Sequence, residues 1–363
     1  MLKSILDKAL TDEILTPCEI QQLVELSDEK ELQALYACAY RIKERTVGPV
    51  AYFRGIIECS NICSKNCYYC GIRKGNPKVE RFQMDEEEIV REAIWCHENR
   101  YGSTVIQSGE RTDAAYLDLI ERVIRRIKKE TGNRLGITLS LGEQTEETYR
   151  RWREAGAHRY LLRIESSNPE LYRQLHPADH SFAVRKNCLA LLKKTGYQVG
   201  TGVMIGLPNQ TSEDLVNDIL FMKQIDIDMI GMGPYIPHRD TPMGKKIPPY
   251  TNEQKKGALT GGLKMIAVTR LVLKDINIAA STALQALHDT GREQGLLAGA
   301  NVIMPNVTET GFRPDYTLYD DKPCTDENSE TSRDHLIRRI ESTGETVGFN
   351  EWGDSPHYAR RTA

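Results

Sequence analysis

The stretch IIECSNICSKNCYYCGIRKGN, residues 56–76, contains four of the nine cysteines of the chain. Three of them, Cys63, Cys67 and Cys70, have the spacing C-x3-C-x2-C and follow an apolar run that is typical of a β-strand. Three thiolates on one short loop can hold an iron–sulfur cluster, because cysteine thiolates are the usual ligands of such clusters. Three protein ligands leave one iron of a four-iron cluster open, as a catalytic zinc keeps an open position. The stretch therefore predicts a cluster that can bind a further molecule.

A structural zinc site and inert buried thiols are the alternatives to a cluster. Zinc usually takes four protein ligands from paired C-x2-C knuckles, and the sequence contains no second knuckle. The fourth cysteine of the stretch, Cys59, lies at the end of the apolar run, where we expect a small buried side chain. The cluster is the favoured interpretation.

The composition indicates a globular protein with a full core. The chain has 363 residues, 40% of them hydrophobic, and a net charge of −3, which gives no electrostatic reason to expect nucleic acid or a membrane surface as a partner. No apolar run approaches the roughly 20 residues of a membrane span, and the charged N-terminus lacks the pattern of a signal peptide. We therefore expect a cytoplasmic protein whose clustered cysteines serve metal or redox chemistry.

Outward from the cysteine stretch, short β-rich runs alternate with longer amphipathic segments. Eight runs are predicted to be strands: residues 50–58, 103–109, 136–142, 159–166, 199–206, 229–236, 276–282 and 301–306. Such alternation favours parallel strands joined by right-handed crossovers, and eight repeats fit a complete (β/α)8 TIM barrel, with a doubly wound sheet as the alternative. We predict three parts: N-terminal helices (1–47), the barrel (48–310), and a C-terminal loop and helix (311–363).

The chemistry of such a barrel lies at the C-terminal ends of its strands. Polar residues do follow the predicted strands, although any loop begins with polar residues: Glu58, Ser60, Gln107, Ser108, Glu110, Thr138, Ser140, Glu143, Arg163, Glu165, Tyr235, His238, Ser281, Thr282 and Asn306. Because burying an unpaired charge is costly, arginines within the apolar strands predict a site for anionic groups such as substrate carboxylates; these are Arg54, Arg159 and Arg163. Glu165 and Arg185 are candidates to bind the ammonium and carboxylate of an amino acid, with a surface salt bridge as the alternative.

Three motifs resemble the radical S-adenosylmethionine (SAM) superfamily. The cysteine triplet, with Tyr69 before its last member, resembles the superfamily signature. QSGE (107–110) resembles the stretch that cups the methionine amine of SAM, and Gly109 there would let backbone groups approach a ligand closely. GVMIGLP (202–208) resembles the element that packs against adenine. The resemblance implies that the open iron chelates SAM, and that one electron cleaves SAM to methionine and a 5′-deoxyadenosyl radical.

From residue 1 to about 310 the chain resembles the HydE family of FeFe-hydrogenase maturases, most specifically in GPYIPHRDTP (233–242) and GANVIMPN (299–306). Biotin synthase and 3-methylornithine synthase are more distant relatives. The resemblance implies a SAM site formed by Tyr69, Ser108, Gly109, Ser140, Glu165, Arg185 and Met204. It implies a substrate cavity formed by Arg54, Gln107, Thr138, Arg159, Arg163, Ser281 and Thr282.

The activity implied by the resemblance is radical chemistry on a small carboxylate-bearing substrate, cysteine-derived or organometallic. It implies a one-electron donor such as flavodoxin or ferredoxin, and a monomer. The alternatives are an amino acid mutase of the methylornithine synthase type, a C–S bond former like biotin synthase, and a non-enzymatic iron–sulfur electron carrier or scaffold.

Three positions near the predicted site, and the C-terminal cysteines, depart from the family pattern. Ile164 stands where the family has His, Arg111 where it has Asp, and Gln144 where it has Trp. Ile164 is expected to lie beside SAM and substrate, and so it favours a substrate different from that of the family. Of the three cysteines that bind a second cluster in the family, the chain keeps only Cys324, and we expect no second cluster.

Overall fold

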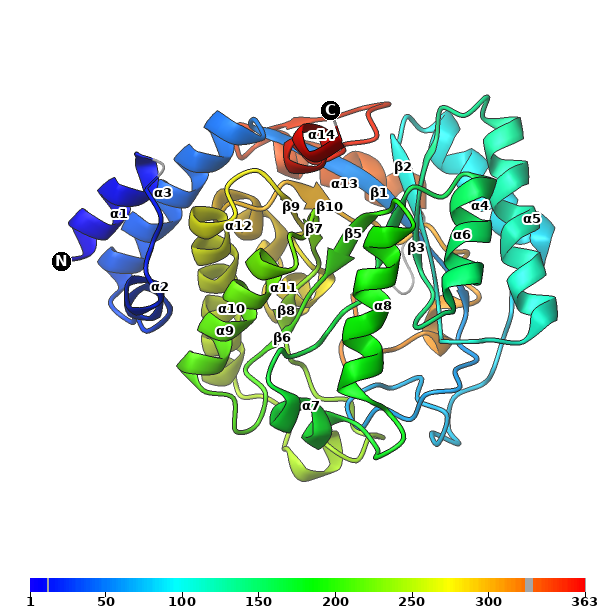
Figure 1. The fold of residues 1–363 in the computed structure, drawn as a ribbon, viewed down its shortest axis with the longest axis horizontal. Helices are drawn as coiled ribbons and strands as arrows, with labels where there is room; N and C mark the ends of the chain where they lie inside the picture. Colours follow the sequence, from blue (N-terminus) through cyan, green and yellow to red (C-terminus); the bar gives the residue numbers. More distant parts are fainter. Residues whose placement is uncertain (12, 324–328, 363) are drawn as a thin grey trace.

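The computed structural model describes residues 1–11, 13–323 and 329–362 and has an α/β fold (Figure 1). Its main sheet has nine strands, of which eight follow the order β10-β1-β2-β3-β4-β5-β7-β9, and β11 pairs with β1. These eight are β1 (Val50–Ser60), β2 (Ser103–Ser108), β3 (Gly136–Ser140), β4 (Arg159–Leu161), β5 (Gln198–Thr201), β7 (Met229–Ile230), β9 (Asn277–Ile278) and β10 (Val302–Ile303). Each predicted run overlaps one of them, and β1 and β5 extend beyond their runs by one or two residues. The prediction of an α/β fold is confirmed.

All neighbouring strands of the sheet are parallel, and the sheet curves into at least a half-barrel. The two outermost strands in this order also approach each other. A parallel bridge joins Ala279, just after β9, to Val302 of β10, and the Ala280 N–H donates to the Val302 carbonyl at 2.9 Å. Two short strands, β6 (Met204–Ile205) and β8 (Gly233–Pro234), pair beyond the ends of β5 and β7.

Helices cover the outer face of the sheet (Figure 1): α4 (Glu86–Glu98), α5 (Ala114–Glu130), α6 (Glu146–Ala155), α8 (Phe182–Lys194), α9 (Ser212–Gln224), α10 (Asn252–Val272), α11 (Thr282–Leu287) and α12 (Gly291–Leu297). The short helix α7 (Pro169–Leu175) lies beyond the ends of the strands and contacts α8. The starts of the helices are encoded locally. Asp85 and Glu88 form a capping box at α4, for example, which satisfies backbone N–H groups that would otherwise lack partners. The inner face of α5 buries Leu119, Ile120 and Val123 at helical spacing.

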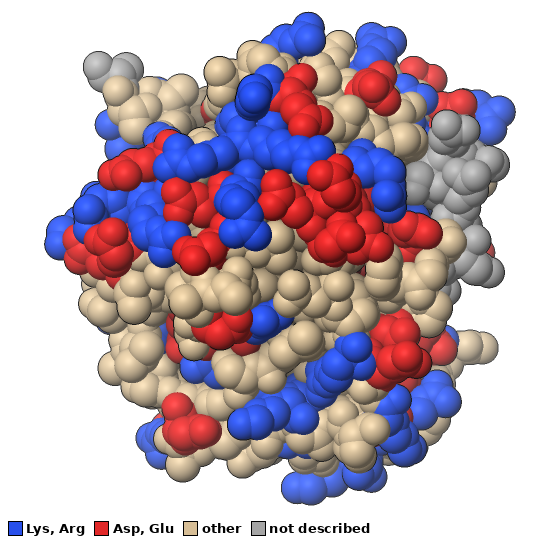
Figure 2. All heavy atoms as spheres, turned by 90° about the vertical axis from the view of Figure 1, so that its right-hand side faces the viewer, with Lys and Arg blue, Asp and Glu red and all other residues tan. Residues whose placement is uncertain are grey.

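The outer faces of α4, α5 and α6 carry mixed charge, as the upper half of Figure 2 shows. Ion pairs link neighbouring helices there, such as Arg122 with Glu86 at 2.9 Å and Arg151 with Glu121 at 2.6 Å. Exposed pairs of this kind contribute little stability, and they leave a solvated surface without a large patch of one sign.

Three helices precede the sheet: α1 (Leu2–Leu10), α2 (Pro17–Val24) and α3 (Glu29–Thr46), of which α3 packs along α10. In the part of the chain that the structure describes, no helix combines the length and apolar character needed to cross a membrane. The predicted boundaries at residues 47 and 310 stay predictions.

The C-terminal region contains more structure than the predicted loop and single helix. It has a 3-10 turn, η2 (Arg313–Asp315), two helices, α13 (Ser329–Glu341) and α14 (Pro356–Thr362), and the strand β11 (Thr346–Val347). β11 pairs with the first residues of β1, so the chain after it crosses the N-terminal ends of the strands. The strand was missed because two residues within a polar segment carry no periodicity.

Candidate active site

The cysteine stretch forms a loop at the C-terminal end of β1, and Arg81 holds it together. The guanidinium of Arg81 donates to the carbonyl oxygens of Asn61, Ile72 and Arg73 at 2.7, 2.8 and 2.6 Å. The side chain of Asn61 accepts from the Phe82 N–H at 2.9 Å. These bonds join the start of the loop to its end and define its shape.

The three thiols of the loop lie near one another and near the end of β2. Burial raises the pKa of the Cys67 thiol to about 12; the guanidinium of Arg185 opposes this shift, and the Cys63 thiol adds to it. Burial also raises the pKa of the Cys70 thiol, and the neighbouring Cys67 and Cys63 thiols raise it further. The Glu110 N–H donates to Cys63 Sγ at 3.3 Å. The predicted triplet is therefore assembled on one loop.

The donor set fits a 4Fe–4S cluster. All three cysteines are free, and none is exposed. Among the described residues, no three His, Cys, Asp or Glu side chains are arranged around a single metal ion. Thiolates that each bind a different iron need not meet at one point, so this spacing is compatible with a cluster. Cys59 is fully buried, as expected.

Gly109 packs closely against the cysteine loop. A Cβ at this position would lie 2.4 Å from the Ile62 carbonyl oxygen and 2.7 Å from Cys63 Cβ. The glycine is therefore required by the close packing of the cysteine loop on the end of β2. That the backbone here also approaches a ligand stays a prediction.

Several predicted SAM residues lie around the thiols. Burial raises the pKa of the Tyr69 hydroxyl, and the Cys67 thiol and Glu165 carboxylate add to this shift, so the three groups are close together. Met204 belongs to a small apolar cluster against which Tyr69 packs. Ser140 is half-buried at the end of β3. The Ser108 hydroxyl is already engaged: it accepts from the Tyr116 hydroxyl and donates to the Gly109 carbonyl, both at 2.6 Å.

Glu165 and Arg185 are both buried, which excludes a surface salt bridge, but each has another partner. Arg185 donates from Nε to Glu143 Oε1 and from Nη1 to the Arg163 carbonyl, both at 2.6 Å. Glu165 Oε2 lies 3.0 Å from Arg163 Nη2, yet it makes no hydrogen bond with any described residue. Glu165 also has a φ of +66°, a left-handed conformation that is strained for a residue with a Cβ.

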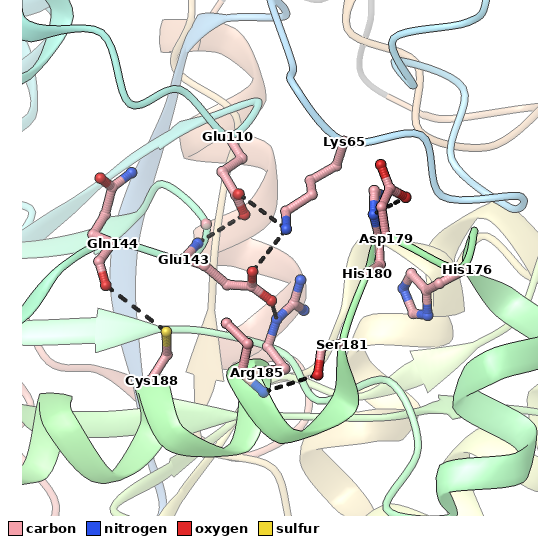
Figure 3. A network of polar contacts seen from close by, with 12 residues as sticks. Lys65, Glu110, Glu143, Gln144, His176, Asp179, His180, Ser181, Arg185 and Cys188 are labelled. Atoms are coloured by element: carbon pink, nitrogen blue, oxygen red, sulfur yellow. Dashed lines mark hydrogen bonds and ion pairs between the residues drawn. The ribbon is translucent and has the colours of Figure 1, made fainter.

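Sequence reasoning did not assign a network that surrounds this arginine (Figure 3). Lys65, between two of the cluster cysteines, lies 2.7 Å from Glu143 Oε2 and 3.3 Å from Glu110 Oε1. The Glu143 N–H donates to Glu110 Oε2 at 2.8 Å. Both glutamates were noted only as polar residues at strand ends, and nothing in the sequence pairs them with Lys65.

Two histidines after α7 also support the cysteine loop. The Asn66 N–H donates to His180 Nε2 at 2.9 Å. His176 donates from Nδ1 to the Tyr172 carbonyl at 2.8 Å, so its Nε2 is the acceptor facing the Tyr69 hydroxyl at 3.5 Å. Burial lowers the pKa of His176 to about 3, which keeps the ring neutral. The motif HPADH gives no signal for this role by itself.

The predicted substrate residues separate into two groups. Near the strand C-termini, Arg163 donates to the Val203 carbonyl at 2.9 Å, and Gln107 donates to the Tyr316 hydroxyl at 3.3 Å. Thr282 accepts from Arg292 at 3.2 Å, whereas the buried Ser281 hydroxyl finds no partner among the described residues.

Arg54 and Arg159 belong to the second group, and the structure does not bring them to the cysteine loop. Arg159 is the first residue of β4; its Nε donates to Asp354 at 3.0 Å, its Nη2 bonds the Trp352 carbonyl and Asp354, and its Nη1 lies 3.5 Å from Thr138 Oγ1. Arg54 donates to the Gly353 carbonyl at 3.0 Å. The prediction of an anion site at the barrel mouth was wrong for these two arginines, because segment 352–354 supplies their partners.

The three residues that depart from the family pattern near the predicted site all lie within the described part of the chain. Ile164 is fully buried within the main apolar cluster, and its predicted position beside SAM stays a prediction. Arg111 pairs with Asp113 at 2.9 Å, and Gln144 donates to the Arg111 carbonyl at 2.8 Å. Two of the altered positions therefore contact each other. Cys324 lies outside the described residues.

The chain is similar to known proteins over almost its whole length. Residues 57–222 match the family model of the radical SAM superfamily. The chain is 44% identical over 335 residues to the FeFe hydrogenase maturase subunit HydE of Thermotoga maritima, with 92% of each chain covered. It is 26% identical over 331 residues to 3-methylornithine synthase of Methanosarcina acetivorans, covering 90% of this chain and 88% of the relative.

Solved structures of related proteins have a similar fold. Methylornithine synthase PylB superposes with a TM-score of 0.80 at 25% identity, covering 95% of this chain and 98% of that one. HydG from Carboxydothermus hydrogenoformans shares the fold, with a TM-score of 0.78 at 21% identity, covering 96% and 79%. The fold and the cysteine loop define a radical SAM enzyme, which uses a 4Fe–4S cluster and SAM. Within that superfamily, the chain belongs to the family of the FeFe hydrogenase maturase HydE.

Proposed function

We propose that this protein carries out HydE-type radical SAM chemistry on a small carboxylate-bearing substrate, cysteine-derived or organometallic, in the maturation of an FeFe hydrogenase. One observation carries the proposal: the loop of Cys63, Cys67 and Cys70 lies beside the buried charges of Glu165 and Arg185 in a chain 44% identical to HydE. Thiolates beside one carboxylate and one guanidinium suit a cluster whose ligand has an ammonium and a carboxylate group.

In this proposal, the three cysteines hold the cluster, and Tyr69, Ser140, Glu165, Arg185 and Met204 contribute to the SAM site. When bound, the cluster supplies the electron that cleaves SAM to methionine and a 5′-deoxyadenosyl radical. Glu165 Oε2 makes no hydrogen bond among the described residues, and its ion-pair partner Arg163 is partly exposed, so the carboxylate suits an additional ammonium group. The neighbouring apolar cluster of Met204, Leu171 and Tyr235 would exclude water from that side.

The proposed substrate groups are those near the strand C-termini. Arg163 supplies a partly exposed guanidinium, Ser281 supplies a buried hydroxyl without a partner among the described residues, and Gln107 and Thr282 supply further polar groups. We leave Arg54, Arg159 and Thr138 out of this set, since the two arginines are bound to segment 352–354 and Thr138 faces Arg159.

The proposed scaffold is a complete (β/α)8 barrel at residues 48–310. The bridge between Ala279 and Val302 supports closure between β9 and β10. We further propose that the protein is a cytoplasmic monomer and that it receives electrons from flavodoxin or ferredoxin. The eight described cysteines are free, which suits a reducing compartment.

The first experiment is SAM cleavage by the anaerobically reconstituted and reduced protein. We expect 5′-deoxyadenosine and methionine in equal amounts. A protein with a full cluster that forms neither product would contradict radical SAM activity and favour an electron carrier or scaffold. If cleavage occurs, addition of the protein to a hydrogenase maturation mixture lacking HydE tests the specific activity, and recovery of hydrogenase activity is expected.

An amino acid mutase of the methylornithine synthase type is the second candidate. It is supported by the TM-score of 0.80 with methylornithine synthase over nearly the full length of both chains. Formation of 3-methylornithine, with no effect on hydrogenase maturation, would favour this candidate over the first.

A further inference from the structure

Four alternating charges connect the cysteine loop to Arg185: Glu110, Lys65, Glu143 and Arg185 (Figure 3). Each comes from a different segment of the chain. Glu110 follows β2, Lys65 lies in the loop after β1, Glu143 follows β3, and Arg185 is in the first turns of α8. The distances along the chain of charges are 3.3, 2.7 and 2.6 Å.

The network holds the loop through backbone as well as side-chain contacts. The Glu110 N–H donates to Cys63 Sγ at 3.3 Å, and its carbonyl accepts from the Ser64 N–H at 2.8 Å. The carboxylate of the same residue contacts Lys65 and the Glu143 N–H. A shift of the loop would therefore move Lys65 relative to both glutamates.

The other end of the network determines how Arg185 is oriented. Glu143 binds Nε and the Arg163 carbonyl binds Nη1, which leaves Nη2 without a hydrogen-bond partner among the described residues. A guanidinium held at two of its three nitrogens presents the third in a defined direction, because the group is planar and rigid. The Arg185 side chain is 9% exposed, so few other orientations are open to it.

We propose that Lys65 and Glu143 are positioning residues that couple the cysteine loop to Arg185, so that the guanidinium is oriented for the SAM carboxylate only when the loop is in place. This proposal rests on the proposed function. Neither residue contacts the ligand in it: Glu143 acts through Arg185, and Lys65 acts through Glu143. The pair is therefore expected to affect SAM affinity more than cluster assembly.

The test compares Glu143→Gln, Lys65→Met and the double variant in the reconstituted full-length protein. SAM affinity is read from the SAM-induced change in the EPR spectrum of the reduced cluster, and iron and acid-labile sulfide are measured in the same samples. We expect each single variant to bind SAM at least tenfold more weakly with iron content unchanged. Since the residues act in series, the double variant should lose little more than the worse single one.

Two control variants remove a charge of the same sign at a position outside the network. Lys74→Met removes an exposed lysine of the same loop, and Glu147→Gln removes an exposed carboxylate of α6; both should bind SAM as the wild type does. Lys65→Arg keeps the cation and should restore most of the affinity lost in Lys65→Met.

Two results would overturn the coupling. One is SAM affinity within twofold of the wild type in both single variants. The other is a loss of iron in Glu143→Gln that accounts for the whole loss of SAM binding, which would make the network merely structural. A wild-type protein whose cluster spectrum does not respond to SAM would overturn the proposed function and this proposal with it, whereas a responsive wild type with unaffected variants overturns this proposal alone.

Discussion

Arginines at the two ends of the sheet have different roles: those at the N-terminal ends of the strands stabilise the fold, and those at the C-terminal ends lie at the candidate active site. β4 shows this within five residues, since Arg159 opens the strand and Arg163 lies just beyond its last residue, Leu161. All three guanidinium nitrogens of Arg159 contact the protein, and the side chain is fully buried. The Arg163 side chain is a third exposed. Its guanidinium pairs with Glu165 and its carbonyl accepts from Arg185, so Arg163 lies at the end of the sheet that carries the cysteine loop.

Figure 1 shows α14, which follows segment 352–354, on the opposite side of the molecule from the loop after β1. Parallel strands bring all their C-terminal ends to one edge, so function gathers there and the other edge is free to be sealed. The position of a charged residue along its strand therefore decides whether it serves the site or the fold.

The largest effect is expected from Cys67→Ala. Removal of one of three cluster ligands should reduce SAM cleavage to the level without enzyme and lower the iron content, because the loop has no fourth thiol that could replace Cys67. The free energy of unfolding of the cluster-free protein should change little. Cys18→Ala, at an exposed cysteine of α2, is the control and should retain full cleavage. Wild-type cleavage by Cys67→Ala would mean that this end of the sheet holds no cluster.

The second prediction compares Arg159→Met with Arg163→Met. Arg159→Met leaves Asp354 without its cation and should cost about 2–4 kcal/mol of unfolding free energy, less than a fully buried pair because Asp354 is 34% exposed. Arg163→Met should cost less, about 1–2 kcal/mol: it leaves the buried Glu165 carboxylate without this cation, but Arg163 itself is a third exposed and makes one side-chain hydrogen bond, to the Val203 carbonyl. Urea unfolding measures both.

Activity should divide in the opposite way. Folded Arg159→Met should cleave SAM and process substrate as the wild type does, whereas Arg163→Met should lose substrate-dependent turnover. Equal loss of stability in both variants, or turnover lost only in Arg159→Met, would contradict the division between the two ends.

A smaller effect is expected from Gly109→Ala, which acts on the catalytic end alone. The added Cβ would lie 2.4 Å from a backbone oxygen of the cysteine loop, so the loop must move, at a cost of about 1–3 kcal/mol. Reconstituted protein should contain less iron per chain than the wild type. Gly257→Ala, on α10 with open space around it, should instead leave iron content unchanged. Normal iron content in Gly109→Ala would show that the loop can relax without loss of its ligands.

The smallest effect is expected in the pH dependence of stability, at the N-terminal ends of the strands, where segment 352–354 covers the sheet. Burial lowers the pKa of His158 to about 3, and Arg159 adds to this shift. The unfolded chain binds a proton below about pH 6.5 that the folded chain does not, so stability should fall as the pH drops from about 6.5 to 3. Asp354 acts in the same direction at lower pH: burial would raise its pKa, but His158 and Arg159 lower it on balance.

His158→Gln should therefore flatten the dependence of unfolding free energy on pH, by at most about 1.4 kcal/mol per pH unit. His335→Gln, at an exposed histidine, is the matched control and should leave the dependence unchanged. An unaltered slope in His158→Gln would mean that His158 is protonated in the fold.

Much of the fold could be predicted because it depends on local patterns. The eight apolar runs and the cysteine spacing are visible without the structure, and each run overlaps a strand. The direction of Arg159 could not be predicted, since its partner Asp354 lies 195 residues away. The same is true of Lys65 and Glu143, which are 78 residues apart. A resemblance carries over residue types, but it does not show which charges neutralise one another in this chain.

The strained geometry at Glu165 has a consequence for directed evolution. Its left-handed φ costs about 1–2 kcal/mol relative to glycine, and one buried carboxylate oxygen lacks a hydrogen bond. Glu165→Gly would relieve both penalties, at the loss of the partly exposed ion pair with Arg163, while removing a proposed ligand contact. A library of variants screened for heat resistance alone would therefore enrich inactive proteins at this position, and any such screen needs a parallel selection for turnover.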